Sequence, residues 1–87
     1  MTDPEREVAA IQFGRNLRRY RRRAGLTQAR LSYLAVLHRT EISLLERGRR
    51  EPRLGTIVKI ASALEVSLNM LLKGTGWTVE HPPLNDS

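Results

Sequence analysis

Residues 27–48, TQARLSYLAVLHRTEISLLERG, have the pattern of two short helices joined by a tight turn. Thr27 is a suitable cap for the first helix, because its hydroxyl can accept a backbone N–H that the first helical turn leaves unpaired. Leu26 and Leu31 flank this cap at the spacing of a hydrophobic staple, which fixes the angle at which the chain enters a helix. We therefore expect the first helix to begin near Gln28.

The second helix of this stretch has the same kind of start. Leu37 and Ile42 form a staple around the cap position, His38. Glu41 stands at the third helical position, where a carboxylate can reach back to the cap or favour the positive end of the helix dipole. This helix should run from about residue 39 to residue 47.

Gly48 supplies the end of the second helix, because the residue just beyond a helix often needs a positive φ that glycine adopts without steric cost. Only about three residues separate the two helices, so the connection must be a sharp turn. This pair of helices is the centre around which the rest of the chain is interpreted.

Composition limits the kind of protein that the chain can be. Its 87 residues suffice for one small domain with a single core, and the absence of cysteine excludes disulfides and thiolate metal sites. The net charge is +6, and thirteen of the fifteen basic residues are arginine, which binds phosphate and guanine in a bidentate way. We therefore expect a polyanionic partner.

The sequence gives no support for membrane insertion, metal binding or catalysis. No apolar run reaches the roughly eighteen residues of a membrane span, and the N-terminus, MTDPEREVAA, lacks the features of a signal peptide. His38 and His81 lie far apart without acidic or cysteine partners at ligand spacing. Neither a glycine-rich phosphate loop nor a Ser/His/Asp constellation can be assembled. We expect a cytoplasmic protein that is not an enzyme and has no cofactor and no metal.

A first helix is predicted ahead of this pair. Asp3 as a cap and Pro4 at the first helical position favour a start there, although a start near Ala9 is also open. The helix should end at Gly25. Its apolar face is predicted from residues that recur every three or four positions: Phe13, Leu17, Tyr20 and Ala24. Its many arginines, between residues 15 and 23, most resemble a solvated surface.

Two further helices follow the pair. After a loop that contains Pro52, a helix of about eleven residues is predicted from apolar positions at helical spacing: Leu54, Ile57, Val58, Ala61 and Leu64, with Ile60 beside them. Ser67 caps a short fifth helix that ends at Leu72. We expect residues 11–73 to form the domain, residues 1–10 an N-terminal extension or the start of the first helix, and residues 74–87 a loosely held tail or a docking strand. Trp77 in that tail can either cover an end of the bundle or mark a partner surface.

Three separated stretches fall in register with one known family: FGRNLRRYRRRAGLTQ (13–28), LHRTEISLLERGRREP (37–52) and IVKIASALEVSLNMLL (57–72). Together they resemble the lambda-repressor-like helix-turn-helix family, also called the Cro/C1 or XRE type. The resemblance implies an all-α fold, a compact five-helix bundle that contains a helix-turn-helix. It also implies that the second helix of the pair enters the major groove of DNA.

The family pattern assigns DNA contacts by position. The expected base contacts are Arg39, Thr40, Ser43 and Leu44, and Ser43 can alternatively donate to a phosphate. Arg39 is the favoured reader, because a guanidinium at the helix start can bind guanine O6 and N7 together. The expected backbone contacts are Thr27, Gln28, His38, Arg47, Arg49 and Arg50. Arg53 resembles a family arginine that enters the minor groove.

The resemblance also assigns structural roles. Arg21 and Glu46 correspond to an arginine and a glutamate that pair across the first and third helices. The chain departs from the family at two positions where glycine is common, Val36 in the turn and Glu65 between the fourth and fifth helices. A β-branched residue at positive φ is unusual, so either Val36 is strained or the turn adopts another conformation.

These observations predict a sequence-specific, double-stranded DNA-binding regulator of transcription, associated with the nucleoid. A homodimer on a pseudo-palindromic operator is expected, because one recognition helix reads few base pairs. The fifth helix, with Asn69 and Met70, is the expected dimer surface. The alternative is a protein-interaction module, such as an antitoxin or a coactivator adaptor, that binds a protein partner through the tail or through Tyr33 and Leu34.

Overall fold

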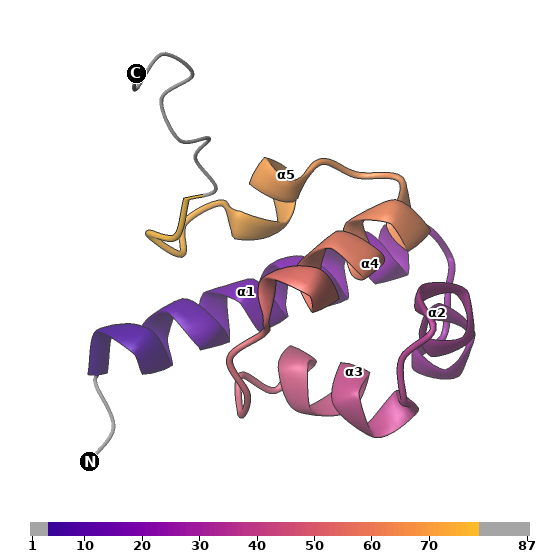
Figure 1. The fold of residues 1–87 in the computed structure, drawn as a ribbon, viewed down its shortest axis with the longest axis horizontal. Coiled ribbons are helices and arrows are strands. Elements are labelled where there is room, and N and C mark those ends of the chain that lie inside the picture. Colours follow the sequence, from indigo (N-terminus) through magenta and orange to yellow (C-terminus); the bar gives the residue numbers. More distant parts are fainter. Residues whose placement is uncertain (1–3, 79–87) are drawn as a thin grey trace, which may run out of the picture.

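The computed structural model describes residues 4–78, which form five helices and no strand (Figure 1). The helices are α1 (Pro4–Arg23), α2 (Gln28–Ala35), α3 (Arg39–Glu46), α4 (Leu54–Leu64) and α5 (Leu68–Leu72). The expected all-α bundle of five helices is thus confirmed. The first helix begins at Pro4, the earlier of the two starts that the sequence left open. Asp3, the expected cap, and His81 lie outside the described residues.

Local capping explains where the short helices begin. The Thr27 hydroxyl accepts a hydrogen bond from the Arg30 amide at 3.0 Å, and the Ser67 hydroxyl accepts one from the Met70 amide at 3.1 Å. Each hydroxyl satisfies an amide that the first helical turn leaves without a partner. His38 occupies the cap position of α3 without a side-chain hydrogen bond. Of the three predicted caps that lie within the described residues, two are therefore chemical caps, and the third is positional only.

The turn between α2 and α3 is strained. Val36 has φ 56° and ψ 52°, the left-handed conformation, and its side chain is 77% exposed. Glu65, which follows α4, adopts nearly the same angles, φ 56° and ψ 43°. In this conformation the Cβ of an L residue crowds the backbone, and a β-branched side chain crowds it most. Of the two alternatives for Val36, the structure therefore contains the strained one.

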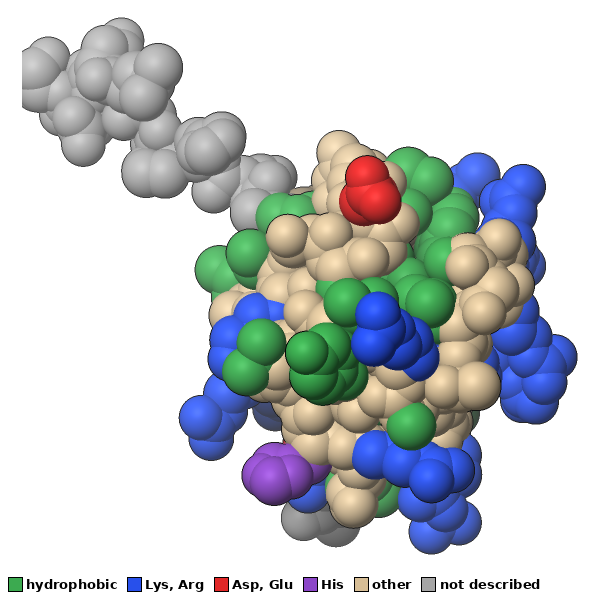
Figure 2. All heavy atoms as spheres, turned by 90° about the vertical axis from the view of Figure 1, so that its right-hand side faces the viewer, with side chains coloured by type: hydrophobic (Ala, Val, Ile, Leu, Met, Phe, Trp, Pro, Cys, Tyr) green, Lys and Arg blue, Asp and Glu red, His purple; other side chains and the backbone are tan. Residues whose placement is uncertain are grey.

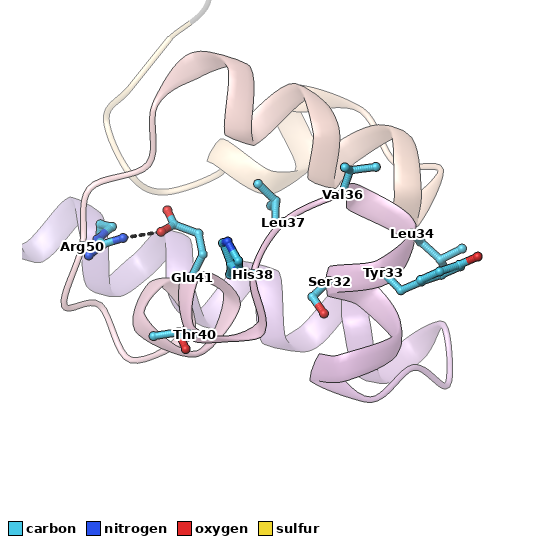
Figure 3. A pocket seen from close by; sticks show the side chains of 9 residues that line it. All are labelled: Ser32, Tyr33, Leu34, Val36, Leu37, His38, Thr40, Glu41 and Arg50. Atoms are coloured by element: carbon cyan, nitrogen blue, oxygen red, sulfur yellow. Dashed lines mark hydrogen bonds and ion pairs between the residues drawn. The ribbon is translucent and has the colours of Figure 1, made fainter.

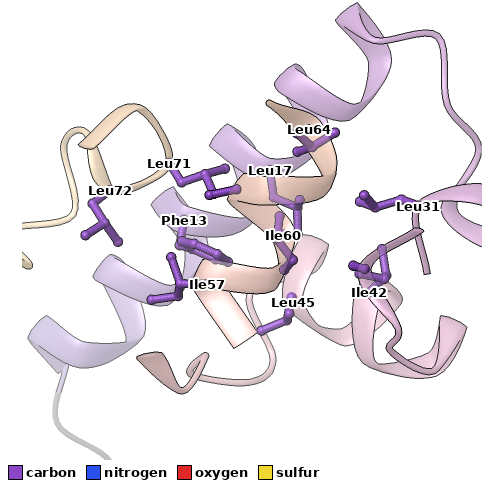
Figure 4. Close-up of a cluster of buried hydrophobic side chains, with 12 residues drawn as sticks. Phe13, Leu17, Leu31, Ile42, Leu45, Ile57, Ile60, Leu64, Leu71 and Leu72 are labelled. Carbon is purple, nitrogen blue, oxygen red and sulfur yellow. The ribbon is translucent and has the colours of Figure 1, made fainter. Parts of the chain in front are cut away.

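The core lies where the five helices meet, with α1 and α4 at its centre (Figure 4). The largest side chains that it buries completely are Phe13, Leu17, Leu31, Ile42, Leu45, Ile60 and Leu71. Three expectations for the apolar faces were wrong. Ala24 is exposed because α1 has ended before it, and Leu54 and Val58 are 56% and 47% exposed.

The error on α4 has a geometric cause. The buried positions of this helix are Ile57, Ile60, Ala61 and Leu64. They follow the i, i+3, i+4, i+7 pattern of one helix face. Leu54 and Val58 lie outside that pattern, so the apolar stripe continues around the helix onto its solvent side.

Close backbone contacts fix α1 against α3. A Cβ at Gly14 would lie 2.4 Å from the Leu45 carbonyl oxygen, so only glycine lets the two helices approach this closely. Gly48 has φ 68°, as the predicted end of the helix requires, and a Cβ there would lie 2.7 Å from Cγ1 of Ile11. Glycine in a helix costs about 1 kcal/mol relative to alanine, which the close packing at Gly14 must offset. α3 and the loop after it are thus seated directly on α1.

A buried asparagine ties α5 to α1. The Asn16 side-chain amide donates to the carbonyl oxygens of Leu71, at 2.7 Å, and Lys73, at 2.8 Å. Trp77 packs against Phe13 with ring centroids 6.2 Å apart, and Thr75 between these segments is buried. Of the two roles open to Trp77, the structure gives it the covering of an end of the bundle. The packed part of the chain therefore continues beyond residue 73.

Candidate nucleic-acid interface

α3 divides into a buried face and an outward face. Ile42 and Leu45 are fully buried, and their spacing of three positions places both toward the core. On the outward side, Arg39 and Thr40 are exposed. Ser43 and Leu44, on the same side, are half-buried. All four expected base contacts are thus accessible to some degree, and the helix start carries the most accessible pair.

The loop between α3 and α4, residues 47–53, is called the arginine loop here. It carries four exposed arginines: Arg47, Arg49, Arg50 and Arg53. Pro52 is the buried residue of the loop, and Arg53 stands at the cap position of α4 without a side-chain cap bond. The loop therefore places guanidinium groups on the surface immediately after the end of α3.

The middle of the arginine loop is paired with α3 itself. The Glu41 carboxylate forms an ion pair with Nη1 of Arg50, drawn as a dashed line in Figure 3. We expected this carboxylate to cap or favour the start of its own helix. It lies in the first turn of α3, where its charge favours the helix start, and it reaches across to the loop, because Arg50 offers a full positive charge and a hydrogen bond together. The spacing of nine residues gave no sequence signal for this contact.

A second ion pair connects the arginine loop to α1. Arg6 donates from Nε to Oε2 of Glu51 at 3.0 Å and from Nη2 to Oε1 at 2.9 Å. These hydrogen bonds lower the pKa of the Glu51 carboxyl below its ordinary value. Forty-five residues separate the partners, so this bidentate pair could not be foreseen from the sequence pattern.

The base of α3 is held by a buried network. Arg21 donates from Nε to Oε2 of Glu46 at 2.5 Å, from Nη2 to Oε1 at 3.0 Å, and from Nη1 to the Leu26 carbonyl at 2.7 Å. The hydrogen bonds to Glu46 raise the pKa of Arg21. The structure thus contains the ion pair that the family pattern assigned to these two residues. Both side chains are at most 10% exposed, so the pair is a structural one.

Gln28 joins this network, which the sequence did not indicate. Its amide Nε2 donates to Oε1 of Glu46 at 3.1 Å. The bond links the start of α2 to the end of α3 through one carboxylate. A contact between Gln28 and the DNA backbone stays a prediction, and so does a contact by Thr27, whose hydroxyl already caps α2.

An open hollow of about 970 Å³ lies beside the turn, between α2 and α3. His38, Thr40 and the Glu41–Arg50 pair line one side, and Tyr33, Leu34 and Val36 line the other (Figure 3). Tyr33 is 72% exposed and its ring lies 5.1 Å from the guanidinium carbon of Arg30. The hollow therefore brings two expected backbone contacts and one expected base contact next to exposed apolar side chains.

Positive charge dominates this end of the molecule. Figure 2 shows Lys and Arg side chains around a patch of hydrophobic ones, with few acidic side chains on the same face. Among residues 4–78, no three His, Cys, Asp or Glu side chains group closely enough to hold a metal ion. Nor is any helix in that range long and apolar enough to cross a membrane. An anion that meets this face would find guanidinium groups at short range.

The helix-turn-helix domain family matches residues 12–72 of the chain. The chain is similar to the control protein C.SmaI of Serratia marcescens, with 39% identity over 70% of this chain and 73% of that protein. It is also 37% identical to the HTH-type transcriptional regulator YqaE of Bacillus subtilis, over 71% of this chain but only 53% of YqaE. The chain thus spans about half the length of that relative.

A solved structure agrees with these sequence relatives. The crystal structure of the restriction-modification controller protein C.AhdI from Aeromonas hydrophila superposes with a TM-score of 0.70 at 37% identity, covering 71% of this chain and 94% of that one. The matched region includes α2, the turn and α3, where the capping, the strained Val36 and the buried Glu46 were found. The chain therefore belongs to the helix-turn-helix domain family.

Proposed function

We propose that this chain regulates transcription by binding a specific sequence of double-stranded DNA, with α3 in the major groove. The observation that carries the proposal is the division of α3, which buries Ile42 and Leu45 and leaves the helix start exposed beside the arginine loop. The relatives support it, because their names are those of transcriptional regulators and controller proteins. We propose no catalytic role, and place the chain in the cytoplasm with the nucleoid.

The proposed contact residues are of two kinds: readers, which contact bases, and anchors, which contact the DNA backbone. Arg39 would bind guanine O6 and N7, because its guanidinium stands at the exposed start of α3. The other base contacts would be Thr40, Ser43 and Leu44. The phosphate contacts would be Thr27, Gln28, His38, Arg47, Arg49 and Arg50, with Arg53 in the minor groove. Anchors of this kind set register and affinity, whereas readers set sequence preference.

A homodimer is expected because the DNA-contacting surface of a single α3 is small. One α3 contacts only a few base pairs, and a two-fold pair places two half-sites about 34–36 Å apart on one face of the duplex. The exposed apolar side chains Leu54, Val58 and Met70 give α4 and α5 a surface that a second copy can cover. Beside Leu54, a hollow of about 600 Å³ reaches Trp77. Sedimentation at micromolar concentration should give a dimer; a monomer that binds both half-sites independently argues against it.

Selection from random duplex DNA tests the proposed function directly. The expected result is an enriched site with two inverted half-sites, together with an affinity that falls steeply as salt rises. Failure to enrich any sequence contradicts sequence-specific binding. The second role that the sequence left open, a protein-interaction module, is not favoured by the relatives. It would show itself as binding to a co-purified protein that survives high salt.

A further inference from the structure

Two ion pairs hold the arginine loop, one to α3 and one to α1. On one side Glu41 of α3 pairs with Arg50, and on the other Arg6 of α1 pairs with Glu51. Residues 4–11, which contain Arg6, lie outside the region that the helix-turn-helix family matches. The second pair is therefore a feature of this chain beyond the matched domain.

The backbone at both ends of the arginine loop is already fixed. Gly48 packs against Ile11 so closely that a Cβ would collide with it, and Pro52 is buried. The segment that remains, residues 49–51, is exposed along its whole length. The two ion pairs attach to this segment, at Arg50 and Glu51, so they tie down the part of the loop that packing leaves unsupported.

The ion pair with Glu41 leaves other N–H donors of Arg50 available. A guanidinium has five N–H donors, and Glu41 engages it through Nη1. The remaining donors can meet a phosphate while the carboxylate holds the group in one orientation. A long side chain that is ordered before binding loses less entropy when it binds, so such a contact strengthens the complex.

Charge alone gives the opposite expectation for these two acids. A carboxylate next to a phosphate-binding arginine lowers the positive potential that attracts DNA, so removing it should tighten binding. We propose that Glu51, clamped by Arg6, and Glu41 are instead positioning residues, which hold the arginine loop in the conformation that meets the phosphates. This inference rests on the proposed DNA-binding function.

The charge argument and the positioning role predict opposite effects of Glu51→Gln on the affinity for DNA. Glu51→Gln raises the net charge by one, yet it should weaken binding of the intact chain to its selected duplex by about two- to tenfold, the size of the ordering cost of a long side chain. Arg6→Gln, which lowers the net charge by one, should weaken binding at least as much, and the double variant should be no weaker than Arg6→Gln alone. Glu7→Gln, at another exposed position of the same helix, adds the same charge and is the matched control, with unchanged or slightly tighter binding.

Tighter binding by Glu51→Gln, or effects of the two single variants that simply add, overturn the proposal. Two further readouts separate positioning from general stability. Both partners are exposed, so the thermal midpoint should stay the same in all three variants, and Arg6→Lys should restore part of the affinity lost in Arg6→Gln. A lowered midpoint that accounts for the lost affinity also overturns it.

The salt dependence of binding distinguishes failure of this inference from failure of the proposed function. A loosened arginine loop meets the phosphates less completely, so the slope of log K against log salt should fall in Glu51→Gln and in Glu41→Gln, by up to the roughly one unit that one phosphate contact contributes. If the unmodified chain shows no salt-dependent binding to any duplex, the proposed function fails. If it binds steeply and both glutamine variants keep the full slope, only the positioning role fails.

Discussion

Replacing Val36 by glycine should make the folded chain more stable, although it removes a hydrophobic side chain. Val36 has φ 56° at the turn between α2 and α3, and its side chain is 77% exposed. The side chain therefore contributes little burial, while the turn holds a residue that carries a Cβ in a sparsely populated backbone conformation. Glycine adopts this conformation without steric cost.

The net effect can be worked out from three terms. Relief of a left-handed non-glycine residue is worth about 1–3 kcal/mol. Glycine gives the unfolded chain more freedom, which costs about 0.4–1 kcal/mol. Loss of the small buried part of the side chain costs below about 0.5 kcal/mol. The balance is a stabilisation near 1 kcal/mol, which should raise the thermal midpoint of a domain of this size by about 4–8 °C.

Urea unfolding followed by circular dichroism, with a thermal scan beside it, measures both quantities. Val36→Ala is the matched variant, because it removes the same branched carbons but keeps the Cβ that conflicts with positive φ. It should gain clearly less than Val36→Gly. Val58→Gly, at an exposed position inside α4, should lose stability instead. Equal gains for alanine and glycine at position 36, or a loss for glycine, would refute the idea that the turn stores backbone strain.

Four other substitutions test the packing of the helices and the proposed DNA contacts. Glu46→Ala should destabilise the fold by about 3–5 kcal/mol, because it leaves the nearly buried Arg21 charge without its partner; a change in urea midpoint worth under 1 kcal/mol contradicts that role. Asn16→Ala should cost about 1–3 kcal/mol by stripping two carbonyls at the end of α5 of their donor, and an unchanged thermal midpoint would show that water replaces it. Arg39→Ala should relax preference at one base pair by about 1–3 kcal/mol in a competition with mismatched duplexes, whereas Arg49→Ala should weaken binding to all sequences alike. Identical effects of the last two variants would remove the distinction between readers and anchors.

The features that sequence could predict are those with local causes. The starts of α2 and α5 follow from a hydroxyl and an amide three residues apart, at Thr27 and Ser67. The end of α3 follows from the positive φ of Gly48. Each of these is decided by chemistry within one helical turn, so the pattern of residues is sufficient.

The features that escaped prediction depend on residues far apart in the chain. Asn16 looks like a surface residue of α1 until α5 folds back and presents two carbonyl oxygens to it. The pairing of Arg6 with Glu51 joins the first turns of α1 to a loop that only the finished fold brings near. The role of Gly14 likewise appears only when α3 crosses α1. No local propensity encodes such contacts, because they are set by tertiary packing.

The backbone contact at Gly14 makes the position of α3 independent of the side chains exposed at its start, two properties that many binding proteins couple. α3 is seated on α1 through the carbonyls of Leu45 and Glu46, at its end, whereas Arg39 and Thr40 stand exposed at its start. With α3 reading bases as proposed, substitutions at the start would change which bases are preferred without moving the helix. The same frame would then serve many operators, and new specificities would arise by exchanging a few exposed side chains while Gly14 stays fixed.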